Sequence, residues 1–74
     1  MSKSIAATRA QLHAELRQYR ELQADFDYYS RATETDTDDP VLYVLTTEIQ
    51  VQQYRVEGVA AELRQMLKAA NGEL

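Results

Sequence analysis

Apolar side chains recur every three or four residues from Ile5 to Tyr29, which is the spacing of one face of an α-helix. Good helix formers lie between them, and residues 4–31 contain no Gly or Pro. Ser2 or Ser4 can cap the first turn. The pattern therefore predicts a first helix over about residues 4–31. Its apolar face consists of Ile5, Leu12, Leu16, Tyr19, Leu22, Phe26 and Tyr29.

The same spacing returns after residue 40 and predicts a second helix over about residues 40–70. Asp39-Pro40 marks its start, because Asp is a favoured N-cap and Pro suits the first helical position. Asn71-Gly72 marks its end. Gly58 lies away from the apolar face and is expected to be a tolerated surface glycine. That face consists of Val41, Leu42, Leu45, Ile49, Val56, Val59, Ala60, Leu63, Met66, Leu67 and Ala70.

Two long helices with a short connection predict an all-α, antiparallel two-helix hairpin that spans residues 1–74 as one domain. If the turn is centred between residues 35 and 36, the numbers of facing residues add to about 71. Tyr19 then faces Gln52, and we expect the phenol to bond to the amide. The facing apolar pairs are Phe26–Leu45, Leu22–Ile49, Leu12–Val59 and Ile5–Met66, with Leu16 beside Val56 and Thr8 opposite Leu63.

The chain is short for a self-sufficient core. It has 74 residues and no Cys, so neither a disulfide nor a thiolate metal site supports it. Below about 80 residues such a chain usually gains stability from regular packing or from a partner. We therefore expect the hairpin to complete a four-helix bundle, either as a homodimer or by docking on another helical protein.

One flank of the predicted hairpin is apolar in the half next to the connecting loop. Because the helices run antiparallel, equal rotations bring residues of both helices to this flank. Outward-pointing tyrosines, including Tyr28, add area of the kind enriched at interfaces. A scatter of exposed apolar residues, normal on any surface, is the alternative interpretation. The predicted interface residues are Leu22, Tyr29, Val44 and Val51, with Tyr43 and Tyr54 as secondary candidates.

The opposite flank is basic, but the formal net charge of the chain is −4. We interpret this flank as a solvated face with weak ion pairs, such as Arg17–Glu21 and Asp27–Arg31. The negative charge and the lack of a base-reading motif argue against nucleic acid as a partner. The basic flank carries Arg9, His13, Arg17, Arg20 and Arg31.

Residues 32–39 form an acidic loop that contains no base. Alternating carboxylates are typical of Ca²⁺ loops, but neither register puts Gly at position six and Glu at position twelve. We therefore expect no metal, and we interpret the segment as a polar turn whose function is left open. Its acidic tip consists of Glu34, Asp36, Asp38 and Asp39.

Catalysis is not expected. The chain has a single His, no Cys and no Gly-rich phosphate loop, so we expect no enzyme activity, no cofactor and no small-molecule substrate. No apolar run reaches the roughly 18 residues that cross a membrane, and the N-terminus lacks a signal-peptide core. The resulting expectation is a cytoplasmic, non-enzymatic protein–protein interaction module: an adaptor, a co-chaperone or an inhibitor.

No motif identifies a family, but the layout resembles two kinds of helical hairpin. The segment Asp39-Pro40-Val41-Leu42-Tyr43, with a Tyr shortly after the turn, is similar to small co-chaperones of type III secretion needle subunits. Those are helical hairpins of about this size, so this resemblance implies a chaperone or adaptor role.

The second resemblance is to the coiled-coil hairpin of Gre-type transcript cleavage factors, which carries acids at its tip. Here it rests on Asp36, Asp38 and Asp39, and on Leu12…Glu15-Leu16 and Tyr43…Arg55-Val56. It implies the alternative function, a regulator that acts through its acidic tip on a larger enzyme such as RNA polymerase.

Overall fold

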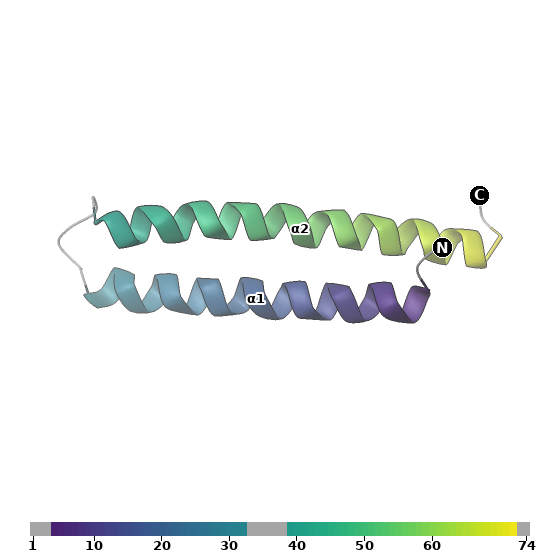
Figure 1. Cartoon of the computed structure of the whole chain (residues 1–74), viewed down its shortest axis with the longest axis horizontal. Coiled ribbons are helices and arrows are strands. Elements are labelled where there is room, and N and C mark those ends of the chain that lie inside the picture. Colours follow the sequence, from purple (N-terminus) through teal and green to yellow (C-terminus); the bar gives the residue numbers. More distant parts are fainter. Residues whose placement is uncertain (1–3, 33–38, 73–74) are drawn as a thin grey trace.

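Two long antiparallel helices make up the structure, a computed structural model that describes residues 4–32 and 39–72. Helix α1 runs from Ile5 to Ala32 and α2 from Pro40 to Ala70. Figure 1 shows the helices side by side, with the start of α1 and the end of α2 at one end of the hairpin and the end of α1 and the start of α2 at the other. The predicted helical hairpin is confirmed, and each predicted helix boundary agrees with the structure to within one residue.

Local signals in the sequence set the helix ends. The Ser4 hydroxyl accepts a hydrogen bond from the Ala7 amide at 3.0 Å. The Asp39 carboxylate caps α2 by accepting one from the Val41 amide at 2.8 Å, directly before Pro40. Both bonds satisfy amide groups that have no partner in the first turn of a helix.

The C-terminal end of α2 agrees with the prediction from Asn71-Gly72. The Asn71 amide donates to the Leu67 carbonyl, and Gly72 adopts a φ of 73°, the left-handed conformation that glycine accepts without a steric penalty. Gly58 is exposed, and a Cβ built there would meet nothing within 4 Å. The prediction of a tolerated surface glycine is therefore confirmed for the hairpin itself.

A seam of side chains at alternating steps of three and four residues holds the helices together. All eight seam positions of α2 are buried or half-buried, as are seven of α1 up to Phe26. Such heptad spacing is that of a coiled coil, in which the seam keeps facing the partner helix along its length. The seam positions of α2, here named the inner stripe, are Leu42, Leu45, Ile49, Gln52, Val56, Val59, Leu63 and Met66.

Polar groups interrupt this seam near its middle. Gln52 is 3% exposed, and its amide donates to the Glu15 carbonyl at 2.9 Å and to the Glu15 carboxylate at 3.2 Å. The expected Tyr19–Gln52 bond is wrong, because the Tyr19 hydroxyl accepts instead from Gln23, one helical turn away, at 2.9 Å. A satisfied polar contact in an apolar seam favours one alignment of the two helices over its neighbours.

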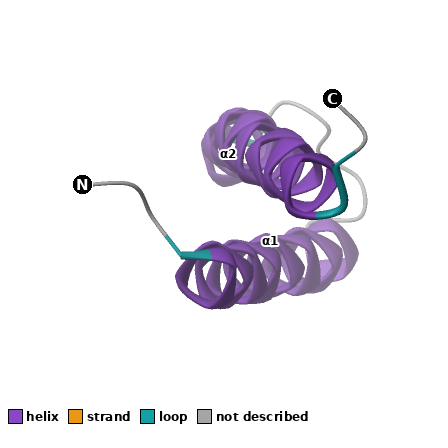
Figure 2. Cartoon of the chain, turned by 90° about the vertical axis from the view of Figure 1, so that its right-hand side faces the viewer, coloured by secondary structure: helices purple, strands orange, loops and turns teal. Residues whose placement is uncertain are grey.

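The hairpin is a single layer of two helices. Its extents are 54 × 20 × 17 Å and its radius of gyration is 16.6 Å, against about 11 Å for a compact domain of this length. Seen along the long axis in Figure 2, neither helix has a further described element against it. Each helix therefore has one face on its neighbour and leaves the others to solvent.

Candidate interaction surface

The predicted interface residues fall into two groups. Five of them are exposed: Val51 at 47%, Val44 at 51%, Tyr29 at 40%, Tyr43 at 76% and Tyr54 at 75%. Leu22 is different, because it is 7% exposed and belongs to the seam between the helices. The prediction that Leu22 lies on the exposed flank is therefore wrong, and its side chain offers no area to a partner.

A second stripe runs along α2 beside the inner stripe. Each of its residues directly precedes a residue of the inner stripe, and one residue in a helix is a rotation of about 100°. The second stripe is therefore turned away from α1 by roughly a right angle, and all of its residues are exposed. We name it the outer stripe; its members are Val41, Val44, Glu48, Val51, Arg55 and Gly58.

Val41 belongs to this outer stripe, which corrects its predicted place on the helix-packing face. It is 45% exposed. Together with Pro40 and Val44 it borders a shallow groove of about 300 Å³, with Leu45 and Glu48 on the other walls. The apolar part of the outer stripe therefore begins in the first turn of α2.

Tyr28, Tyr29 and Tyr43 lie near the loop end of the hairpin, whereas Tyr54 lies near the middle of α2. Tyr28 and Tyr29 at the end of α1 are in edge-to-face contact, with ring centroids 5.1 Å apart. Tyr43 and Val44 border one groove at this end, with Phe26 and Leu42 among its other lining residues. Tyr54 lies three residues after Val51, so these two side chains are neighbours on the surface of α2.

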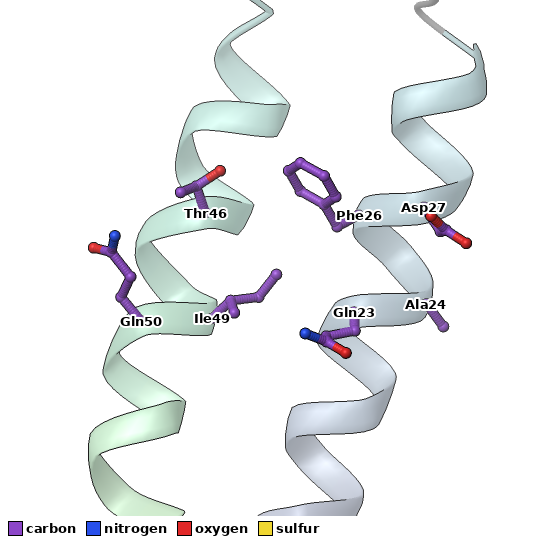
Figure 3. A pocket seen from close by; sticks show the side chains of 7 residues that line it. All are labelled: Gln23, Ala24, Phe26, Asp27, Thr46, Ile49 and Gln50. Carbon is purple, nitrogen blue, oxygen red and sulfur yellow. The ribbon is translucent and has the colours of Figure 1, made fainter.

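The other side of the seam has a groove of a different kind. Figure 3 shows Phe26 reaching from α1 toward Thr46 and Ile49 of α2, with Gln23 and Gln50 at the sides. The groove holds about 550 Å³ and is open to solvent, and polar side chains border it. It lacks convergent ionisable groups of the kind that bind or transform a small ligand.

The structure describes one of the four acidic tip residues. Asp39 caps α2 through its carboxylate, so part of the acidic charge has a structural use. Glu34, Asp36 and Asp38 lie outside the described residues, as does most of the predicted loop 32–39, although Ala32 ends α1. In residues 4–32 and 39–72, no three His, Asp or Glu side chains gather in a way that could hold a metal ion.

The basic flank of α1 is open to solvent along its length. Arg9, His13, Arg17 and Arg20 are all exposed. The predicted Asp27–Arg31 pair is confirmed at 3.7 Å, with both side chains more than two-thirds exposed. An exposed pair one helical turn apart contributes little to stability.

Neither α1 nor α2, as far as the structure describes them, is long and apolar enough to cross a membrane. Comparison with known proteins gives no match: no protein family, no curated protein sequence and no solved structure matches this chain. The function of the chain is therefore inferred from the geometry of the hairpin and from the chemistry of its exposed side chains.

Proposed function

We propose that the chain is a non-enzymatic protein–protein interaction module that binds a helical surface through its outer stripe. In this role it is a cytoplasmic adaptor, co-chaperone or inhibitor. Two helices of the partner pack on the hairpin and complete a four-helix bundle. The observation that carries the proposal is the run of exposed valines on the outer stripe, Val41, Val44 and Val51, beside an already filled seam.

The surface area of the chain supports a partner. The accessible surface is 5856 Å², whereas a folded monomer of 8.5 kDa exposes about 4,650 Å². The excess of about 1,200 Å² is of the order of the 800 Å² that each protein contributes to a standard interface. This excess follows from the elongated shape of the hairpin, which leaves area that a second pair of helices could cover.

The outer stripe also has the make-up of an interface. Its valines are flanked by Tyr54, and Tyr29 lies in the last turn of α1, near the loop end of the hairpin. Aromatic side chains are enriched where protein surfaces meet, and an apolar centre with polar residues around it is the usual anatomy of such a patch.

The alternative function is a regulator that acts through the acidic tip on a larger enzyme such as RNA polymerase. In that case the contact surface is the charged tip and not the apolar outer stripe. It needs Glu34, Asp36 and Asp38 to meet the target, and it leaves the exposed valines without a role. The two proposals therefore differ in which residues touch another protein in the cell.

A photo-crosslinking amino acid placed at single positions distinguishes them. We expect Val44 and Val51 positions to crosslink to a protein, whether a second copy or another chain, and the Ala24 position on the back of α1 to serve as a silent control. Mass spectrometry of the crosslinked product identifies the partner and the contacted residue.

Crosslinks at Val44 and Val51 support the interaction module. Crosslinks confined to positions 34, 36 and 38 overturn it in favour of the tip-acting regulator. Equal crosslinking at Val44 and Ala24 also overturns it, because a specific surface is then absent.

A further inference from the structure

The outer stripe repeats the spacing of the inner stripe, which indicates a second helical neighbour for α2. The outer residues step by three and four along the chain, as do the inner ones. Two heptad stripes at roughly a right angle are what a helix needs when it packs between two others in a bundle. In the hairpin α1 covers the inner stripe, and no described residue covers the outer one.

The part of the outer stripe from Val44 to Gly58 is complementary to itself when it is reversed. Val51 is the centre of this segment, and Val44 and Gly58 each lie seven residues from it. If α2 of a second copy lies antiparallel and is centred on Val51, each Val44 meets Gly58 of the second copy and Val51 meets its own equivalent. A contact of this type, in which the same patch serves both molecules, is the usual interface of a two-fold dimer.

The charges on the outer stripe select this antiparallel arrangement. Glu48 lies three residues before Val51 and Arg55 four residues after it, so the reversed helix brings each Glu48 to within one residue of Arg55 of the second copy, an axial offset of about 1.5 Å. Among the described residues neither side chain has an ion-pair partner within the chain. A parallel arrangement would instead set Glu48 against Glu48 and Arg55 against Arg55, which like-charge repulsion disfavours.

Gly58 gives an independent indication. Glycine weakens a helix interior, and the hairpin does not require it, because a Cβ at this position meets no atom within 4 Å. A residue without a side chain lets another helix approach the backbone closely. In the antiparallel pair, Gly58 provides the space that Val44 of the second copy occupies.

We propose that the partner of the outer stripe is a second copy of this chain, with α2 antiparallel to α2 about a two-fold axis at Val51. This inference rests on the proposed function and specifies its partner. The chain exposes about 1,200 Å² more than a compact monomer of its mass, whereas a standard dimer interface takes about 800 Å² from each chain.

Charge reversal on the purified chain tests the arrangement. Glu48→Arg gives an outer stripe with two positive charges, and Arg55→Glu gives one with two negative charges. Each variant alone should self-associate more weakly than the unaltered chain by about tenfold or more. An equimolar mixture should restore dimers, because both contacts between the two variants are then attractive. Sedimentation equilibrium measures each dissociation constant.

Two variants on another face of α2 are the matched control. Glu57 and Arg64 are also exposed and seven residues apart, but they lie off the outer stripe. Glu57→Arg and Arg64→Glu should leave self-association within about twofold of the unaltered chain, since exposed charges away from an interface contribute little.

The outcomes separate this inference from the proposed function. Loss of dimers in both single variants and their return in the mixture support the antiparallel pair. If the mixture fails to restore dimers, the antiparallel arrangement is overturned. If the unaltered chain is itself monomeric, self-association is overturned altogether. In the monomeric case, crosslinks from Val44 and Val51 to a different protein would still support the interaction module, whereas their absence would overturn that as well.

Discussion

The two stripes of α2 have the same spacing but different surroundings. On the inner stripe, Leu45, Val59 and Leu63 are each 8% exposed and pack against α1. On the outer stripe, Val44 and Val51 lie one residue before inner positions and are about half exposed. Apart from Gln52 the inner stripe is apolar from Leu42 to Met66, whereas the outer stripe is apolar only in the half next to the loop. The hairpin needs the first stripe to fold and leaves the second available to a partner.

The largest difference that we expect between the stripes is in stability. Leu45→Ala should lower the free energy of unfolding by about 2–4 kcal/mol, because it leaves a cavity in the seam. Val44→Ala, on the adjacent residue, should lower it by less than about 1 kcal/mol, since a half-exposed side chain buries little area. Urea unfolding followed by circular dichroism, at concentrations low enough to keep the chain monomeric, measures both. An equal loss of unfolding free energy in the two variants would contradict the claim that only the inner stripe stabilises the hairpin.

A smaller effect of opposite sign is expected at Gly58. Gly58→Ala should raise the stability of the monomeric hairpin by up to about 1 kcal/mol, because Ala favours the helix and its Cβ meets no other group. Gly58→Gln should keep the hairpin folded but weaken dimers, since its longer side chain fills the space assigned to Val44 of the second copy. Thermal melting at low concentration and sedimentation at high concentration measure the two effects separately. Dimers of undiminished affinity in Gly58→Gln would remove Gly58 from the interface.

The helix ends could be predicted from the sequence because their signals are local. Asp39 and Pro40 start α2, and Gly72 follows its end, within one or two residues of the groups that they satisfy. The overall hairpin followed from two apolar periodicities and a short connection. None of these inferences needed the exact rotation of either helix about its axis.

The assignment of residues to faces was less accurate, for a geometrical reason. A straight helix drifts by about 20° per heptad relative to a seven-residue repeat. Counted at 100° per residue, Leu22 falls on the flank and Val41 on the packing face. Two helices that wind around each other remove this drift, so that Leu22 is buried and Val41 is exposed.

The polar contacts of the seam could not be derived from facing positions alone. Tyr19 finds Gln23 on its own helix, one turn away, and this local partner competes with any group across the seam. The Gln52 amide of α2 donates instead to Glu15 of α1, which lies one turn before Tyr19. Of the outer stripe, the exposed positions of Val44 and Val51 were predicted, whereas Val41 was assigned to the packing face.

The most direct test of the account places a single cysteine at the proposed two-fold axis. The natural chain has no Cys, so any disulfide in a Val51→Cys variant joins two copies through this position. Under mild oxidation Val51→Cys should form covalent dimers rapidly, because only residues close to the axis bring their Cβ atoms within disulfide range. Val44→Cys should form few, since its two copies are about 21 Å apart along the antiparallel helices. Covalent dimers from Val44→Cys at an equal or higher rate would contradict the antiparallel pairing of α2.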